Sequence, residues 1–347
     1  MIDRVPVAVI GASGYVGAEL VRLLVRHPNV HLRGLYAHRH AGHEVAKDFP
    51  QFAGVLQAKY EPFDAAAVAA SCAVAFLALP HGESAKAARE LHQRGVVVLD
   101  LSADLRLRSA DVYKQWYAEH AAPELLPHAI YGLVERHRAA LASARLVAVP
   151  GCYPTASILA LAPLLDAKLI QPDGLIIDAK SGVSGAGREP QRSTHFSEIG
   201  EGVRAYKVAG HRHTPEIEQE LERAAGTPVR LVFTPHLVPM ARGILATCYA
   251  LPTDPARPAQ AYADELRRAY ANEPFVAVVD HPPDTAHLRG SNRVQVAAWH
   301  DARTGRVIVC GAIDNLVKGA AGQAVQCLNV LRGWDETTGL DGAGIFP

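Results

Sequence analysis

The segment from residue 5 to residue 24 constrains the fold more than any other part of the chain. A short apolar run, Val5 to Ile10, leads directly into a glycine-rich turn, Gly11-Ala-Ser-Gly14-Tyr-Val-Gly17, and apolar residues then recur at helical spacing. This order of strand, turn and helix is typical of a dinucleotide-binding fold, because glycines let the backbone approach a pyrophosphate that the helix N-terminus attracts. A glycine turn that holds no ligand is the alternative interpretation.

Continuous apolar runs alternate with helical patterns through the rest of the first half. They cover residues 30–36, 73–79 and 96–101. Such runs are typical of parallel strands buried on both faces, so we expect a Rossmann-type, doubly wound α/β domain. The second half holds longer β-rich runs, and they predict an α+β catalytic domain with a mixed or antiparallel sheet.

Composition excludes several classes of function. The 347 residues carry 35 Lys plus Arg against 35 Asp plus Glu, which gives no general attraction for nucleic acid or an anionic membrane. No apolar run approaches the length of a membrane span, and the N-terminal run is too short for a secretion signal. We therefore expect a cytoplasmic protein with no nucleic-acid or membrane partner.

The end of the second apolar run indicates which dinucleotide binds. NAD-binding domains carry an acidic residue about 20 residues after the glycine turn, yet the chain has no Asp or Glu between Glu19 and Glu44. The run is instead followed by His38, Arg39 and His40, whose charge suits the 2'-phosphate of NADP(H). With His43 these histidines could also form a metal site, but Arg39 would repel a cation, so we expect no metal. A solvated loop is the remaining alternative.

Cys152 is the candidate nucleophile among five cysteines. It follows a Pro-Gly turn and precedes Pro154 and a helical pattern, which would place its sulfur at a helix N-terminus, where the thiolate is favoured. A buried structural cysteine is the alternative. The other four cysteines lie in strand or helix patterns and are expected to be structural; they are Cys72, Cys248, Cys310 and Cys327.

A cysteine nucleophile needs a nearby base, and His211 and His213 occur together. Residues two apart on a strand share a face, so one of the two could reach the thiol, although paired loop histidines are often only solvated. The glycine-rich segment 180–187 lacks the last glycine of a Gly-x-Ser-x-Gly elbow, which argues against a serine hydrolase. A thiolate beside a nicotinamide suits the interconversion of an aldehyde and an activated acyl group.

Motifs along nearly the whole chain resemble the N-acetyl-gamma-glutamyl-phosphate reductase family of the aspartate-semialdehyde dehydrogenase group. The segments that carry the resemblance include GASGYVGAEL at Gly11, LALPHG at Leu77, DLSADLRL at Asp100, PGCYPT at Pro150, SGVSGAGR at Ser181, GHRHTPEI at Gly210 and DNLVKGAAGQAVQ at Asp314. The resemblance implies NADPH-dependent reductive dephosphorylation of N-acetyl-L-glutamyl 5-phosphate, in arginine biosynthesis. The products would be the 5-semialdehyde and phosphate, formed through a thioacyl intermediate on cysteine.

The resemblance also assigns roles to individual residues. Cys152 would be the acyl-accepting nucleophile, His213 the first candidate for the acid/base and His211 the second. Arg106 and Arg212 would hold the anionic ends of the substrate. The residues expected to contact the cofactor are Gly11, Ser13, Gly14, Tyr15, Val16, Gly17, His38, Arg39, Pro80, Ser181, Gly182 and Asn315.

The placement of Asn315 implies that the last helix returns to the first half of the chain. We therefore expect an NADP-binding domain from residues 1–150 with 315–347, and a catalytic and oligomerisation domain from residues 151–314. The resemblance further implies a homo-oligomer, either a dimer or a tetramer. Three alternatives for function remain: an aspartate-semialdehyde dehydrogenase, a reductase of a carrier-linked acyl phosphate, and a non-catalytic NADP sensor. A sensor would have no use for Cys152 beside a histidine pair.

Overall fold

The computed structural model describes residues 4–346, and the chain folds into two compact units. The first unit runs to Gly151 and includes Ala320–Asp341, and the second comprises Cys152–Gly319 with the chain from Gly342 onward. Residues 1–3 and 347, which belong to our expected first domain, lie outside the described residues.

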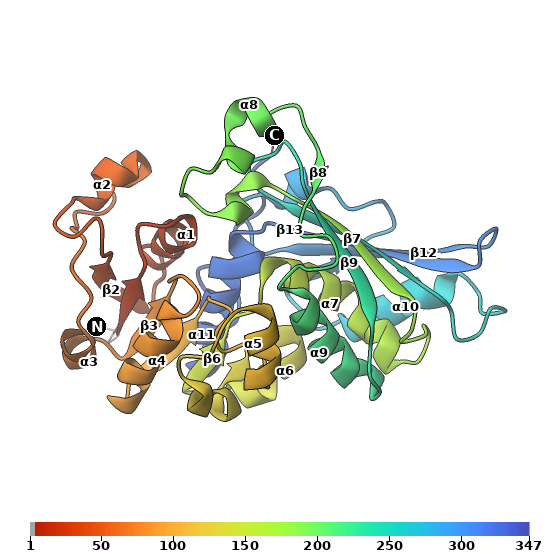
Figure 1. Cartoon of the computed structure of the whole chain (residues 1–347), viewed down its shortest axis with the longest axis horizontal. Coiled ribbons are helices and arrows are strands. Elements are labelled where there is room, and N and C mark those ends of the chain that lie inside the picture. The colour runs from red at the N-terminus through yellow and green to blue at the C-terminus, as the bar shows by residue number, and fades with distance from the viewer. Residues whose placement is uncertain (1–3, 347) are drawn as a thin grey trace. The chain divides into compact units, whose positions relative to one another are not determined.

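A six-stranded parallel sheet forms the centre of the first unit (Figure 1). Its strands are β1 (Val5–Ile10), β2 (Val30–Tyr36), β3 (Val74–Leu77), β4 (Val97–Asp100), β5 (Ile130–Tyr131) and β6 (Leu146–Ala148), in the order β2-β1-β3-β4-β6-β5. The helices are α1 (Tyr15–Leu24), α2 (Val45–Asp48), α3 (Ala65–Ser71), α4 (Glu83–Gln93), α5 (Ala110–Trp116), α6 (Val134–Leu141) and α11 (Gly322–Leu331). The strand order reverses direction at β1, so the prediction of a doubly wound parallel sheet is confirmed.

Apolar sequence explains why the central strands lie inside this unit. Every residue of β3 is buried, as are five of the six in β1, because helices leave no solvated face on a doubly wound sheet. The late helix α11 packs against α1 and α6. His27 Nε2 and Asn329 Oδ1, 2.9 Å apart, join its surface to the end of α1.

The second unit is built on a seven-stranded mixed sheet. Its strands are β7 (Leu175–Ser181), β8 (Arg204–Ala205), β9 (Leu231–Leu237), β10 (Ile244–Ala250), β11 (Val276–Val278), β12 (Val294–Asp301) and β13 (Arg306–Ile313), in the order β11-β12-β13-β10-β7-β9-β8. The neighbours of β10 and β13 are antiparallel, whereas β7 and β9 run parallel. The predicted mixed sheet is therefore confirmed.

Helices cover one face of this second sheet. They are α7 (Cys152–Asp166), α9 (Thr214–Ala225) and α10 (Gln260–Ala269), which lie together on one side of the strands (Figure 1). Burial alternates along β7 and β10, so only every second side chain packs against the helices. The side chains on the other face are partly or fully exposed, including Ile176 and Val232. The short helix α8 (Phe196–Ile199) lies in the segment between β7 and β8.

Two short segments lie with the second unit although our domain division assigns them to the first. Residues 315–319 pack there, and Gly319 N donates to Asp314 O. The chain end does so as well, because Ile345 N donates to Arg289 O at 2.7 Å. The π-helix η6 (Val317–Ala321) carries the chain from one unit to the other. Among the described residues, no helix combines the length and apolar character needed to cross a membrane.

Candidate active site

The glycine turn between β1 and α1 has the backbone geometry of a phosphate cradle. Gly11 has a φ of +86°, and a Cβ there would lie 2.2 Å from Ala78 O, so only glycine fits. A Cβ on Gly17 would lie 2.3 Å from Gly11 O. Gly14 differs, since its φ of −83° is ordinary and its Cβ would meet only Gly11 O at 3.6 Å. The open space beside Gly14 and the absence of acidic residues from the first turn of α1 fit the pyrophosphate of a dinucleotide.

The other predicted cofactor residues of the first unit lie at the same edge of the sheet. His38 and Arg39 follow β2 and are exposed, and Pro80 follows β3, while the turn itself follows β1. These three strands are adjacent and parallel, so their carboxyl ends coincide. Gly11 N confirms the proximity by donating to Tyr36 O, the last residue of β2, at 2.9 Å.

Cys152 is the first residue of α7 and is partly exposed. The helix has fifteen residues, with Pro154 in its first turn, and its N-terminal dipole favours a thiolate at this position. Burial raises the pKa of Cys72, Cys248 and Cys310 above that of an ordinary thiol, which keeps these three protonated. Cys327 is buried and donates from Sγ to Gly132 O at 3.0 Å.

A cluster of aromatic rings and histidines surrounds the side chain of Tyr153, the residue after the candidate nucleophile. Its ring centre lies 5.6 Å from that of His211 and 6.0 Å from that of His213. Its hydroxyl accepts a hydrogen bond from Tyr206 at 3.1 Å. Burial raises the pKa of Tyr206 to about 12, the hydrogen bond with Tyr153 opposes this shift, and the charge of the Cys152 thiolate adds to it. Burial also raises the pKa of Tyr153, and Tyr206 and the charge of Cys152 add to this shift.

The two histidines have different environments. His211 is buried, and desolvation together with the charges of Lys207 and Arg212 lowers its pKa to about 3. Its Nδ1 accepts a hydrogen bond from the backbone N of His213 at 3.2 Å. His213 is partly exposed and lies at the N-cap of α9. His211 therefore remains neutral and orients the backbone at His213, whose side chain is the more exposed of the two.

Three predicted cofactor residues of the second unit lie together. Asn315 Oδ1 accepts from Gly243 N at 2.7 Å, and its Nδ2 donates to Ser184 Oγ at 3.0 Å. Ser184 belongs to the loop that follows Ser181 and Gly182. A Cβ on Gly182 would lie 2.8 Å from the backbone of Ala241, so this loop packs closely against the segment that precedes Gly243.

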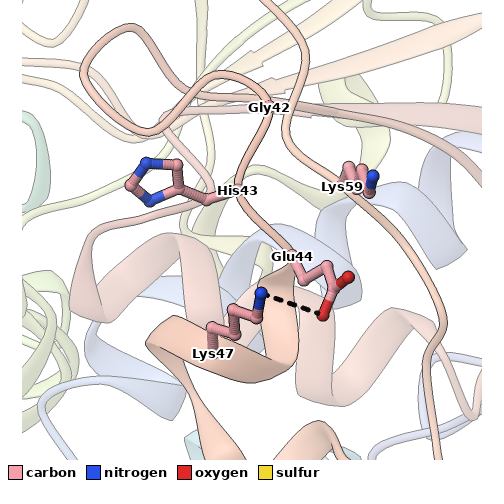
Figure 2. Close-up of a pocket in the computed structure, with 5 residues that line it drawn as sticks. All are labelled: Gly42, His43, Glu44, Lys47 and Lys59. Carbon is pink, nitrogen blue, oxygen red and sulfur yellow. Dashed lines mark ion pairs between the residues drawn. The ribbon is translucent and has the colours of Figure 1, made fainter.

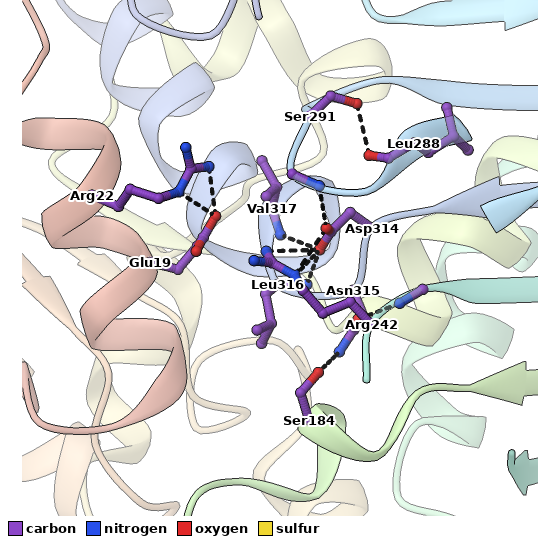
Figure 3. Close-up of polar contacts among 12 residues, drawn as sticks. Glu19, Arg22, Ser184, Arg242, Leu288, Ser291, Asp314, Asn315, Leu316 and Val317 are labelled. Carbon is purple, nitrogen blue, oxygen red and sulfur yellow. Dashed lines mark hydrogen bonds and ion pairs between the residues drawn. The ribbon is translucent and has the colours of Figure 1, made fainter. Parts of the chain in front are cut away.

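The buried carboxylate of Asp314 fixes this arrangement (Figure 3). It accepts hydrogen bonds from Leu316 N at 2.8 Å and from Gly290 N at 2.6 Å, and it forms an ion pair with Arg242 at 3.0 Å. Asp314 thereby connects its own loop, which contains Asn315, to the loops that contain Gly290 and Arg242. Arg242 is held by this ion pair.

The predicted substrate arginines occupy different units. Arg106 is buried in the first unit, where its guanidinium donates to Val149 O at 2.8 Å and to Leu101 O at 2.7 Å. Arg212 belongs to the second unit and is partly exposed. Its charge lowers the pKa of Lys207, after the larger effect of burial. Lys207 and Arg212 thus form a pair of cations suited to an anionic ligand.

Sequence reasoning missed Tyr153, Tyr206, Lys207 and Gly319. The signal for Tyr153 was its place beside Cys152. Lys207 and Ala209 have φ values of +46° and +56°, and this strained loop brings Tyr206 into the cluster, which no pattern indicated. A Cβ on Gly319 would lie 2.7 Å from Cys152 Cβ, a contact that only the folded chain reveals.

Both halves of the chain match families of one enzyme class. Residues 6–144 match the family described as semialdehyde dehydrogenase, NAD binding domain, and residues 152–315 match semialdehyde dehydrogenase, dimerisation domain. Solved structures agree in fold. Aspartate semialdehyde dehydrogenase II from Vibrio cholerae, complexed with ASA, gives a TM-score of 0.73 at 19% identity and covers 95% of this chain and 99% of its own. The enzyme with NADP from Candida albicans gives 0.69 at 14% identity, with the same coverage. The fold and the family matches are those of a semialdehyde dehydrogenase-type oxidoreductase.

Curated relatives define the family more closely. The N-acetyl-gamma-glutamyl-phosphate reductase of Magnetococcus marinus is 49% identical over 344 residues, 98% of each chain. Those of Desulforudis audaxviator and Rhodospirillum rubrum are each 51% identical and cover 99% and 100% of this chain, and in both cases 100% of the relative. The chain belongs to the N-acetyl-gamma-glutamyl-phosphate reductase family.

Proposed function

We propose that this enzyme reduces N-acetyl-L-glutamyl 5-phosphate with NADPH to N-acetyl-L-glutamate 5-semialdehyde and phosphate, a step of arginine biosynthesis. The observation that carries the proposal is Cys152 at the first residue of α7, beside a cluster that contains His211 and His213. This arrangement occurs in a chain that is 49–51% identical over its whole length to reductases named for that substrate.

The thiolate of Cys152 attacks the acyl carbonyl carbon of the substrate. A carbon–sulfur bond forms while the carbon–oxygen bond to phosphate breaks, and phosphate leaves with the electron pair, needing little acid assistance. The N-terminus of α7 favours the attacking thiolate, and Gly319 allows the π-helix segment to pack against the Cys152 Cβ. The result is a thioester on Cys152.

The nicotinamide supplies a hydride to the thioester carbon when NADPH is bound. His213 donates a proton to the resulting oxyanion and takes it back when the carbon–sulfur bond breaks, which releases the aldehyde and regenerates the thiolate. A positioned acid/base of this kind contributes about 10²- to 10⁴-fold in rate. His211 stays neutral and acts as a positioning residue through its hydrogen bond with the His213 backbone.

The anionic groups of the substrate need cations. We assign this role to Arg212 with Lys207 in the second unit, and to Arg106 in the first. The assignment of Arg106 is supported by its anchoring to Val149 O, three residues before Cys152 in the chain, because a guanidinium held this rigidly is already oriented for an oxyanion.

We propose NADP(H) as the cofactor, with Arg39 and His38 at its 2'-phosphate. Both are exposed at the end of β2, beside the glycine turn, and no acidic residue lies in the first turn of α1. The variant Arg39→Gln should raise the KM for NADPH by at least about tenfold, since a charged hydrogen bond contributes about 1.5–3 kcal/mol. The KM for NADH should stay unchanged.

The matched control for this variant is Arg33→Gln, which removes another exposed arginine from β2. It should leave both KM values unchanged. An Arg39→Gln enzyme with the parent KM for NADPH would remove Arg39 from the 2'-phosphate site.

The open face of the second sheet is the proposed interface of a dimer or tetramer. Val232, Ile176, Tyr249, Ile308 and Trp299 occupy paired positions on five adjacent strands and form an apolar row across it. Ile176 is 36% and Val232 58% exposed, which is unfavourable unless another surface covers them. The match to a dimerisation domain supports this proposal.

A cytoplasmic location is supported by the five cysteines, which are all free thiols.

The experiment that tests the substrate runs the reaction in the oxidative direction. Enzyme, NADP+ and phosphate are mixed with N-acetylglutamate 5-semialdehyde or with aspartate semialdehyde, and NADPH absorbance is followed. We expect a signal with the N-acetylated aldehyde only. A signal with aspartate semialdehyde alone would favour the second candidate, an aspartate-semialdehyde dehydrogenase, whose solved structures share the fold.

A further inference from the structure

A second cluster of ligand-type side chains lies in the first unit, in the loop and short helix that follow β2. One ligand atom from each of His40, His43 and Asp48 lies within 4.8 Å of the other two. The three residues come from two adjoining elements, since the histidines flank a turn and Asp48 ends α2. The sequence offered His38 as the third candidate ligand, whereas the structure brings Asp48 to the two other histidines.

The polar contacts of this cluster are already partly formed. His40 Nδ1 lies 2.6 Å from Asp48 Oδ2. The rings of His40 and His43 are 5.5 Å apart between centroids and nearly perpendicular. His43 N donates to His40 O at 2.9 Å, and His43 O accepts from Tyr60 N at 3.0 Å, so the backbone of the turn is fixed on both sides.

We propose that His40, His43 and Asp48 bind one borderline transition-metal dication of the Zn²⁺, Co²⁺ or Ni²⁺ type. Two imidazoles and one carboxylate are a donor set that suits these ions, whereas Mg²⁺ and Ca²⁺ prefer oxygen ligands alone. With metal–ligand bonds of about 2.0–2.2 Å, tetrahedral ligand atoms lie about 3.3 Å apart. The His40–Asp48 contact must widen by less than about 1 Å, and the exposed His43 ring must turn toward the other two.

The charges around the cluster leave room for a dication. Lys47 is paired with Glu44 at 3.8 Å, and Arg39, whose charge led us to expect no metal, has an exposed side chain. Asp48 supplies a negative charge, which the two histidines do not provide. Bound metal would tie the turn to α2 and hold the loop that follows the proposed 2'-phosphate residues.

The pocket next to this cluster does not have the geometry of an anion-binding site. It measures about 290 Å³ and is lined by Gly42, His43, Glu44, Lys47 and Lys59. Figure 2 shows that the side chains of His43, Lys47 and Lys59 point in different directions, and that Lys47 faces Glu44. These side chains do not converge on an anion, so the polar atoms that do converge are those of the three ligands.

The test uses the full chain as its Cys152→Ser variant, which removes the candidate catalytic thiol as a competing ligand. After treatment with a chelator, Co²⁺ is added and visible absorption is recorded, and Zn²⁺ binding is measured by calorimetry. We expect one ion per chain and the absorption bands of a low-coordinate Co²⁺ site. Mg²⁺ should give no heat. Adding His43→Ala or Asp48→Asn should weaken binding by more than about tenfold.

His43→Ala is the decisive variant, because His43 lies outside the His40–Asp48 contact and is exposed, so its loss leaves that contact intact. His281→Ala is the matched control, another exposed histidine beside an aspartate in sequence. It should bind the ion as the parent does. Absence of binding in the Cys152→Ser protein, or binding that survives His43→Ala unchanged, would overturn the proposal and leave His40 and Asp48 as a simple ion pair.

Discussion

Gly319 lies directly against Cys152: a Cβ at this position would be 2.7 Å from the Cβ atom of Cys152 and 3.1 Å from its α-carbon. The close approach arises where the chain forms the π-helix η6, with Gly319 N bonded to the carbonyl of Asp314, five residues earlier. π-helical turns often mark functional sites. Because Gly319 has no side chain, the backbone of η6 packs directly against Cys152, the first residue of α7.

Gly319→Ala is expected to displace Cys152. The added methyl group must move the start of α7, and overpacking of this kind costs about 1–3 kcal/mol of stability. Displacing a reacting group by about 1 Å can reduce kcat about 100-fold. Alkylation of Cys152 by iodoacetamide and kcat should fall together. Gly342→Ala, where a Cβ meets nothing within 4 Å, is the control and should match the parent. Parent kcat in Gly319→Ala would contradict the positioning role.

Two glycines of the first turn should respond differently to alanine. Gly11→Ala places a Cβ 2.2 Å from Ala78 O at a φ of +86°, so the protein should lose thermal stability. Gly14→Ala meets only Gly11 O at 3.6 Å and should keep its Tm. Its methyl group should occupy pyrophosphate space and raise the KM for NADPH by about tenfold, equal to about 1.4 kcal/mol. An unchanged KM in Gly14→Ala would mean that the dinucleotide does not approach this residue.

The buried imidazole of His211 should make stability depend on pH. Its pKa is lowered from 6.5 to about 3 by burial and by the charges of Lys207 and Arg212. Between these two pH values the unfolded chain binds more protons than the folded one, so the free energy of unfolding must fall as pH falls from 6.5 toward 3. His211→Gln should therefore lose less stability than the parent between pH 7 and pH 5 in urea unfolding. Equal losses in the two proteins would show that His211 titrates normally when folded.

Much of the fold follows from local sequence. Strands β1, β3 and β4 are apolar along most of their length, and turns that contain glycine, proline or serine end them, so their parallel arrangement was predictable. The π-helix η6 was not, because its sequence continues directly into α11 and neither Gly319 nor Gly322 by itself indicates a change of helix type. Its position depends on hydrogen bonds to Asp314, which form only in the folded chain.

The candidate site, like the fold, has some features that local sequence predicts and others that depend on tertiary contacts. Gly11 and Cys152 were identified because both stand at junctions of a strand, a turn and a helix, where backbone N–H groups are available. The approach of Tyr206 to Tyr153 could not be predicted, since 53 residues separate them and a loop with positive φ values makes the contact. Asp48 was missed for a similar reason: a four-residue helix brings it to His40.

The central claim is that Cys152 carries the acyl group, and its most direct test omits phosphate. Enzyme mixed with NADP+ and N-acetylglutamate 5-semialdehyde, without phosphate, should form one equivalent of NADPH in a burst and then stop. Mass spectrometry should find an N-acetylglutamyl group on Cys152, and added phosphate should release it. Cys152→Ser should give no burst while still binding NADP+. A burst with no adduct, or an adduct on another residue, would contradict the assignment of Cys152 as the nucleophile.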